Sequence, residues 1–380
     1  MRKKISDMPL MVDDVESINI CYPFISSKAI EYVTDTLSGR WIGQGPKVDL
    51  FEKKFKEKFS EGKEAISVNS GTSALHLAYT LCDIKPGDEV IVPLFTCTAT
   101  NIPLLYMGAN IRFADVDIDT LNMDLNHVES LVNEKTKAIV PVHYGGLCND
   151  MDRLNQIASK YNIPIIQDAA HSIGTTYKGK HLSELSDYVI HSFQAIKHFT
   201  TGDGGMLLVN EEMVDKAKRV RWFGIDRKAK QGGIWENDIY ELGYKYQMTD
   251  ISAAIGLAAL EEIDDVLIKR KKLFNHYCDK LNTDDVTIIG DHRKDEHGAW
   301  LFTIYVQNRY ELQTKLVENK IESNQMHFRN DRYTIFEEFT QGLEFPNMDQ
   351  IDDNYLVLPL HHKMTYGDVE RICDIINKGW

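Results

Sequence analysis

Short apolar runs rich in β-branched residues alternate with helix-like segments between residues 63 and 210. Segments 72–82 and 151–162 place apolar residues at the i, i+3 and i+4 spacing of an amphipathic helix. Strands that are apolar along their whole length and alternate with helices are typical of a parallel sheet covered on both faces. We therefore expect an α/β fold with a mainly parallel, seven-stranded sheet, whose strands cover residues 64–68, 89–95, 111–117, 137–144, 163–168, 188–193 and 205–210.

The pattern changes after residue 250. Residues 251–281 have the apolar spacing of one long helix, and a shorter region with a clear strand at residues 300–306 follows it. We expect a large ligand-binding domain with an N-terminal segment over residues 1–250 and a smaller α+β C-terminal domain over residues 251–380.

The composition restricts the class of protein. Of the 380 residues, 43% are hydrophobic and 26% are charged, as in ordinary soluble globular proteins. The net charge of −14 argues against nucleic acid or an anionic membrane as the main partner, because like charges repel. No apolar run approaches the roughly 18 residues needed to cross a bilayer, and residues 1–17 lack the apolar centre of a signal peptide. Six scattered cysteines without a CxxC pair suit reduced thiols, so we expect a cytoplasmic protein without a zinc site.

Residues with distinctive chemistry follow several of the expected strands. In an open parallel sheet, ligands bind beyond the carboxyl ends of the strands. The turn from Asn69 to Ser73 leads from the first strand into a helix, whose free N–H groups and positive dipole end suit a phosphate. A serine or threonine helix cap with nothing bound is equally compatible with this turn.

Asp168 ends one of the later expected strands, and Lys197 follows the next one. A buried Asp168 needs a cation or several donors, although a helix cap or an ion pair would also explain it. Lys197 lies between an apolar strand and a glycine-rich turn, and a lysine can form a Schiff base with a carbonyl cofactor. A phosphate cradle, an acid and a lysine along one sheet edge meet the needs of pyridoxal 5′-phosphate (PLP). We predict that Asp168 keeps the ring nitrogen of PLP protonated and that Lys197 binds its aldehyde and moves a proton.

Five motifs lie between residues 70 and 260: SGTSALHLA, GDEVIVP, DAAHSIG, SFQAIKHFTTGDGGM and GYKYQMTDISAAIGLAAL. In this order and spacing they resemble the sugar aminotransferases of the DegT–StrS family, within the fold-type I, aspartate-aminotransferase-like PLP enzymes, and the resemblance runs from about residue 41 to about residue 365. The resemblance implies transfer of an amino group, most often from glutamate, to the keto group of a sugar, usually nucleotide-linked. It also implies a role in making surface polysaccharides or glycosylated natural products, and a homodimer with shared active sites.

The resemblance assigns roles to single residues. The family's catalytic lysine corresponds to Lys197, and its partner for the pyridinium nitrogen corresponds to Asp168. A dehydratase branch of the family carries histidine in place of the lysine, so Lys197 favours amino transfer. The remaining ligands of the cofactor phosphate and ring correspond to Gly71, Thr72, Ser192 and His171.

Two positions near the cofactor depart from the family pattern. Cys97 stands where an aromatic residue often stacks on the cofactor ring. Either Cys97 or Phe95 would cover the ring, unless Cys97 is simply a core residue. Lys245 replaces a frequent asparagine in a segment that usually reaches the phosphate of the neighbouring subunit. We expect Lys245 to supply a cation across the dimer interface, with a solvated surface lysine as the alternative.

The substrate pocket also departs from the family pattern. Residues 326–336 replace a stretch that tends to shape this pocket, and Arg329 and Arg332 within it would meet a phosphate or a carboxylate, or be exposed charges. One alternative function is amino transfer to a smaller phosphorylated ketone or aldehyde. Another is a non-catalytic regulatory protein with a PLP-enzyme fold. The presence of both Lys197 and Asp168 argues against the regulator, which has no chemical need for the pair.

Overall fold

The computed structural model describes residues 17–236 and 238–380, without the side chains of residues 228, 231, 294 and 295. Residues 1–16, which belong to the segment searched for a signal peptide, lie outside the described residues. None of the described helices combines the length and the apolar composition required to span a membrane.

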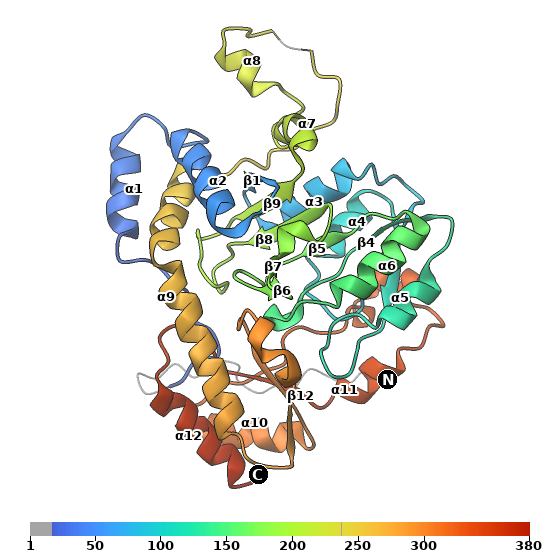
Figure 1. Cartoon of the computed structure of the whole chain (residues 1–380), viewed down its shortest axis with the longest axis vertical. Coiled ribbons are helices and arrows are strands. Elements are labelled where there is room, and N and C mark those ends of the chain that lie inside the picture. The colour runs from blue at the N-terminus through green and yellow to red at the C-terminus, as the bar shows by residue number, and fades with distance from the viewer. Residues whose placement is uncertain (1–16, 237) are drawn as a thin grey trace.

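A seven-stranded sheet forms the centre of the larger part of the chain (Figure 1). Parallel bridges between Ile139 and Ile165 and between Val142 and Asp168 join a four-stranded and a three-stranded group. Of these strands, β9 alone runs antiparallel to its neighbours, so the prediction of a mainly parallel sheet is confirmed. The strands lie in the order β1 (Glu64–Val68), β9 (Gly205–Val209), β8 (Tyr188–Ser192), β5 (Ile166–Asp168), β4 (Thr136–Ile139), β2 (Glu89–Pro93) and β3 (Asn110–Ala114).

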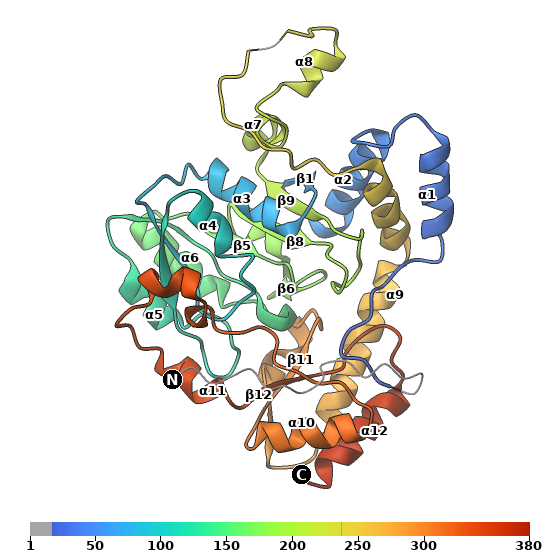
Figure 2. The same ribbon diagram turned by 180° about the vertical axis from the view of Figure 1, so that it is seen from behind.

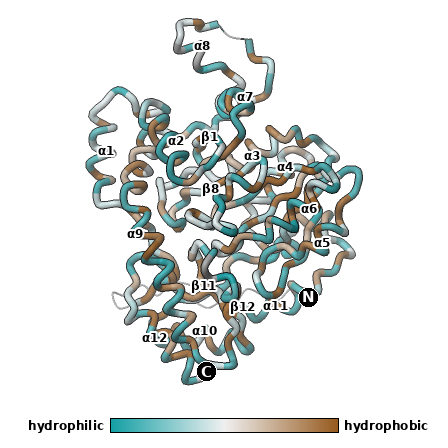
Figure 3. The backbone as a smooth tube through the Cα atoms, in the orientation of Figure 1, coloured by the Kyte–Doolittle hydropathy of each residue, from teal (hydrophilic) through white to brown (hydrophobic). Residues whose placement is uncertain are grey.

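The sheet separates two hydrophobic cores because successive side chains of a strand point to opposite faces. Along β9, Leu207 and Val209 belong to one core, whereas Met206 and Leu208 belong to the other. The first core also contains the apolar face of α3 (Gly71–Leu81), and the second contains those of α2 (Pro46–Phe59) and α6 (Met151–Tyr161). In Figure 3 the helices around the sheet carry alternating teal and brown bands, as amphipathic helices do.

The long helix α9 (Asp250–Lys280) connects the large sheet to the C-terminal part (Figure 2). Its first residues pack in the second core, and Leu273, Phe274 and Tyr277 pack in a third core. That core is built on an antiparallel sheet of β10 (Val286–Ile288), β11 (Phe302–Val306) and β12 (Tyr355–Leu358), with α10 (Arg309–Glu318) and α12 (Tyr366–Asn377). Trp300 and Tyr355 belong instead to the first core, so the C-terminal part packs against the large sheet. A domain boundary at residue 250 stays a prediction.

Two of the differences from the predicted elements concern β5 and a short hairpin. β5 begins at Ile166 rather than at residue 163, because Pro164 has no N–H group to donate to a neighbouring strand. A short hairpin, β6–β7, was not expected. The remaining elements are α1 (Ala29–Ser38), α4 (Ile102–Tyr106), α5 (Leu125–Leu131), α7 (Val214–Val220), α8 (Arg227–Gln231), α11 (Pro346–Ile351), β6 (Thr176–Tyr177), β7 (Lys180–His181) and the 3-10 helices η1 (Tyr144–Gly146), η2 (Leu182–Glu184), η3 (Glu211–Met213), η4 (Asp291–Glu296), η5 (Asn330–Arg332) and η6 (Thr334–Phe339).

Candidate active site

Lys197 lies in the turn after β8 and is only 9% exposed. Its Nζ lies 3.8 Å from the centroid of the Trp300 ring. Burial lowers the pKa of Lys197 to about 8. A lysine with a lowered pKa has a larger neutral fraction near neutral pH, and the neutral amine is the nucleophile. Three nearby side chains act in the opposite direction and raise this pKa: Cys97, Asp168 and Cys21.

Asp168 ends β5 and is 4% exposed. The hydroxyl of Thr100 donates a hydrogen bond to Oδ2 at 2.8 Å, and the backbone N–H of Ala170 donates to Oδ1 at 3.1 Å. Burial raises the pKa of Asp168, whereas these two donors and the charge of Lys197 lower it. Two carboxylate oxygens can accept about four hydrogen bonds, so Asp168 can accept a further one from a protonated ring nitrogen.

The start of α3 and the end of β8 form a narrow cradle. A Cβ atom placed on Gly71 would lie 2.9 Å from Cβ and 3.0 Å from Oγ of Ser192, so the backbone approaches this serine as closely as it does only because Gly71 lacks a side chain. Ser70 caps the helix by accepting the N–H of Ser73 at 3.0 Å. The first N–H groups of a helix have no carbonyl partner within it, so those of Gly71 and Thr72 suit a phosphate.

The rings of His171, Trp300 and His327 stack together beside Lys197. The ring of His171 stacks on Trp300 at 3.9 Å between centroids, and its Nε2 lies 3.3 Å from Nε2 of His327. Burial holds the pKa of His171 well below its usual range, which favours the neutral form of the ring. Nδ1 of His171 is buried without a hydrogen-bond partner among the described residues, which leaves it available to a bound molecule.

The two candidates for covering the cofactor ring have different surroundings. Phe95 is 1% exposed, and its ring packs against those of Tyr144 and Tyr355 at 5.0 Å and 5.1 Å. Phe95 is therefore a core residue. Cys97 follows β2, is half-buried and lies close enough to Lys197 to affect its pKa. Cys97 is the better placed of the two.

Lys245 is exposed and precedes α9. Its Nζ donates a hydrogen bond to Gln247 at 2.5 Å and lies 5.6 Å from the centroid of the Phe223 ring. Its backbone carbonyl accepts a hydrogen bond from the side chain of Asn69 at 3.2 Å, two residues before Gly71. The segment thus borders the phosphate cradle of its own chain, and a contribution of Lys245 to a neighbouring subunit stays a prediction.

Arg329 and Arg332 contact carboxylates of their own chain. The Arg329 guanidinium makes a bidentate contact with Asp331, with both N–O distances at 2.7 Å, and it also pairs with Asp349. Arg332 pairs with Asp352. Both arginines therefore help to fold the segment of residues 326–336, and the Arg329 side chain is largely buried rather than an exposed charge.

Three residues of the site were not identified from the sequence: Thr100, Trp300 and His327. Thr100 lies in a threonine-rich turn just beyond β2, a place where polar residues of a parallel sheet often bind ligands. That position was a usable signal for Thr100. Trp300 and His327 come from the C-terminal part of the chain, and nothing in their local sequence indicates that they reach the sheet edge.

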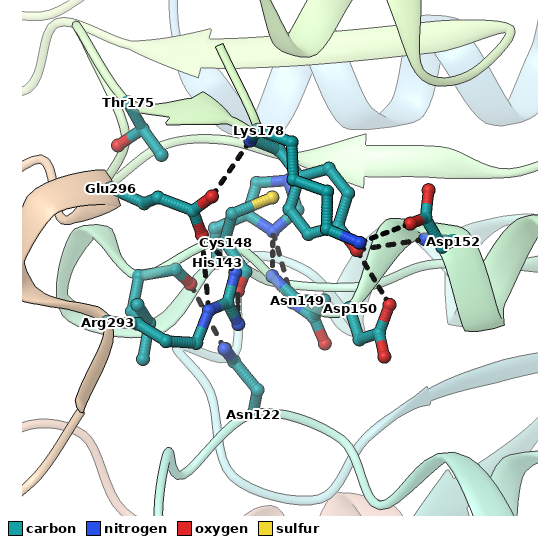
Figure 4. A network of polar contacts seen from close by, with 12 residues as sticks. Asn122, His143, Cys148, Asn149, Asp150, Asp152, Thr175, Lys178, Arg293 and Glu296 are labelled. Atoms are coloured by element: carbon teal, nitrogen blue, oxygen red, sulfur yellow. Dashed lines mark hydrogen bonds and ion pairs between the residues drawn. The ribbon is translucent and has the colours of Figure 1, made fainter. Parts of the chain in front are cut away.

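A polar network fixes the loop beside the end of β5 (Figure 4). Nε2 of His143 lies 2.7 Å from Oε1 of Gln167, and the Asn149 amide donates to the carbonyl of Val142 at 2.8 Å. The Arg293 guanidinium donates to the carbonyl of Cys148 at 2.8 Å. These contacts hold loop 142–149 from two sides, and Val142 in this loop pairs with Asp168 through a parallel bridge.

The site fits PLP group by group. The cradle at Gly71 suits its phosphate, Asp168 its ring nitrogen and the buried amine of Lys197 its aldehyde, while Nδ1 of His171 is free for a polar group of the ring. Bound there, PLP supplies an electrophilic carbon and a ring that accepts electrons from the substrate. The fold and the site together define a fold-type I PLP-dependent enzyme.

Comparison with known proteins gives the family. The chain belongs to the DegT/DnrJ/EryC1/StrS aminotransferase family, whose model matches residues 23–377. It is 34% identical to the spore coat polysaccharide biosynthesis protein SpsC of Bacillus subtilis, over 93% of this chain and 95% of the relative. It is 32% identical to the UDP-4-amino-4-deoxy-L-arabinose–oxoglutarate aminotransferase of Shewanella sediminis, over 96% of this chain and 98% of the relative.

A solved structure also supports membership of this aminotransferase family. The protein Spr1654 of Streptococcus pneumoniae, in its pyridoxamine-phosphate (PMP) form, superposes with a TM-score of 0.88 at 30% identity, over 95% of this chain and 98% of that one. The same protein has also been solved in a PLP form. The prediction of a PLP-dependent aminotransferase is thus confirmed. The roles of the individual site residues stay predictions.

Proposed function

We propose that this aminotransferase moves the amino group of glutamate to the keto group of a nucleotide-linked sugar, in the biosynthesis of a surface polysaccharide or another glycoside. The observation that carries the proposal is the convergence of Lys197, Asp168 and the Gly71 cradle at one sheet edge, in a chain related along its whole length to sugar aminotransferases. The name of the Shewanella relative contains a UDP-linked sugar and oxoglutarate, the keto acid formed from glutamate. The name of the Bacillus relative supports the link to polysaccharides.

Each residue has a distinct task in this proposal. Gly71, Thr72 and Ser192 hold the phosphate through N–H groups and a hydroxyl. Asp168 holds a proton on the ring nitrogen because its buried carboxylate needs a donor. Lys197 binds the aldehyde and, once the amino donor has displaced it, carries a proton between carbon atoms. The lowered pKa of Lys197 suits both tasks, since the amine must be neutral to accept that proton.

A screen of substrates tests the proposal. The purified protein, loaded with PLP, would be given glutamate together with UDP- or GDP-linked keto-sugars or with small keto-phosphates. We expect an amino sugar, and 2-oxoglutarate beyond the one equivalent per site that glutamate alone releases, only with nucleotide-linked substrates; both are detected by mass spectrometry. Lys197→Ala is the control for non-enzymatic transfer. Turnover of keto-phosphates alone would contradict the proposed substrate class and favour the smaller-ketone alternative.

We infer further that two chains form a homodimer with shared active sites. A segment of residues 223–236 and 238–242, which includes α8, projects from the rest of the chain (Figure 1). A cluster of exposed apolar residues on a projecting segment supports a protein interface, and Lys245 lies three residues after the end of the segment. The large apolar side chains that are at least 45% exposed there are Phe223, Ile234, Trp235, Ile239, Tyr240 and Leu242.

Complementation tests the shared site. Lys197→Ala and Lys245→Ala subunits would be mixed, unfolded together and refolded, so that mixed dimers form. If Lys245 serves the partner's site, a mixed dimer has one site with both defects and one with neither, and activity returns. An absence of recovery would count against shared sites.

A cytoplasmic location completes the proposal, because the six free cysteines suit a reducing compartment.

A further inference from the structure

Hydrogen bonds hold the segment that carries Trp300 against loop 142–149. The backbone N–H groups of Trp300 and Leu301 both donate to the carbonyl of Gly145 at 3.0 Å. The buried guanidinium of Arg270, on α9, donates to the carbonyls of Ala299 at 2.9 Å and Trp300 at 2.7 Å. Hydrogen bonds to the carbonyl of Gly145 and from the guanidinium of Arg270 therefore hold the backbone of Trp300 in place.

Trp300 contacts the catalytic lysine segment in two ways. The indole N–H donates a hydrogen bond to the carbonyl of Ile196 at 2.9 Å, which ties the ring to the residue before Lys197. The Nζ atom of Lys197 lies 3.8 Å from the centroid of the same ring. An ammonium group at this distance over an indole is attracted by the electrons of the ring face, and the attraction is stronger where water is excluded. Trp300 is 1% exposed, so water is excluded here.

We propose that the indole face of Trp300 is the docking place of the Lys197 amine whenever that amine is not bound to the cofactor. The proposal rests on the role of Lys197 given above. An aminotransferase alternates between two half-reactions. Between them the cofactor carries the amino group, and the lysine is not bound to it. A long, flexible side chain would otherwise lose its orientation, whereas the indole holds it in one position. Trp300 is thus a positioning residue that acts through Lys197.

The indole also adjusts the charge of the amine. Burial lowers the pKa of Lys197, and the ring face opposes this effect because it stabilises the ammonium form. Burial and the ring face thus shift the pKa of Lys197 in opposite directions. Among the described residues, the other titratable groups with an electrostatic influence on Lys197, or influenced by it, are Asp168 at the end of β5, His171 after β5, Cys97 after β2, Cys21 near the N-terminus, His198 beside Lys197 and His327 from the C-terminal part.

The experiment measures the pKa of Lys197 directly in the full-length enzyme loaded with pyridoxamine 5′-phosphate. Amine-reactive labelling at a series of pH values, followed by mass spectrometry of the Lys197 peptide, gives this pKa without any turnover. In Trp300→Leu we expect it to fall by roughly half a unit to one unit, because the ammonium loses its aromatic face. Trp300→Phe keeps such a face and should remain near the parent value. An unchanged or higher pKa in Trp300→Leu would overturn the proposal.

Two further arms keep the outcome decisive. If Trp300→Leu does not fold, fluorinated tryptophans incorporated into the otherwise unchanged protein weaken the ring face with little change of shape. The pKa of Lys197 should then fall stepwise with the number of fluorine atoms, and a constant value would overturn the proposal. Labelling of the PLP-loaded parent tests the role of Lys197 separately. Protection of Lys197 there supports that role, whereas free labelling would contradict the role and not the contact with Trp300.

Discussion

Thr100→Val removes a single hydroxyl, the one that donates a hydrogen bond to Asp168 at 2.8 Å. Valine has almost the shape of threonine, so the change leaves no cavity, and both residues are buried too deeply for water to replace the lost donor. A hydrogen bond to a charged acceptor contributes about 1.5–3 kcal/mol. Since 1.36 kcal/mol corresponds to one pKa unit, the pKa of Asp168 should rise by roughly one to two units.

The pH dependence of kcat/KM measures this change. Catalysis needs the ionised carboxylate, so activity falls as the pH drops through the pKa of Asp168. Burial already raises this pKa, and loss of the Thr100 donor raises it further, so the acid limb of the profile moves to higher pH. Thr96→Val is the matched control. It removes the neighbouring hydroxyl, 3.1 Å from that of Thr100, but leaves the hydrogen bond to Asp168, so its pH profile should stay close to that of the parent. Profiles of Thr100→Val and the parent that superimpose would refute the reasoning.

Three other substitutions test separate parts of the structure. Asp168→Asn should retain cofactor but lose at least about 99% of kcat, since the electron-accepting ring is no longer held protonated; activity near the parent level would contradict this role. Gly71→Ala should weaken cofactor binding about tenfold or more in a titration, because its Cβ has no room in the cradle, whereas Gly43→Ala, with open space around it, should not. Glu52→Gln removes the negative charge that pairs with the buried Arg221, and it should lower the free energy of unfolding in urea by about 3–5 kcal/mol. Glu57→Gln, which breaks an exposed pair, should change it by less than about 1 kcal/mol.

The sequence predicts the parts of this fold in which one local pattern is sufficient. β1 and the helix α9 have nearly the predicted ends, because a continuous apolar run and a 3.6-residue period are both local properties. The direction of β9 could not be predicted in this way, since antiparallel pairing depends on how the chain returns to the sheet. The same holds for the hairpin β6–β7, whose strands have two residues each.

In the candidate site, too, the sequence predicts the residues that have a local pattern and misses those that depend on distant contacts. Asp168 and Lys197 were found because each follows an apolar strand, and the structure places them close enough to affect each other's pKa. Trp300 lies beside the lysine because its backbone N–H binds the carbonyl of Gly145, which is more than 150 residues away in the sequence. No local pattern encodes such a contact. Arg329 illustrates the converse, because its charge suggested a ligand while its partners are carboxylates of the same chain.

The central claim is that Lys197 carries the cofactor and the chemistry. The absorbance spectrum tests it most directly. The parent protein with PLP should be yellow, with a band that glutamate bleaches as 2-oxoglutarate forms. Lys197→Ala should fold as the parent does, judged by circular dichroism and urea unfolding, yet lack that band and turnover. A Lys197→Ala protein that kept the parent's band and made 2-oxoglutarate at the parent rate would contradict the account.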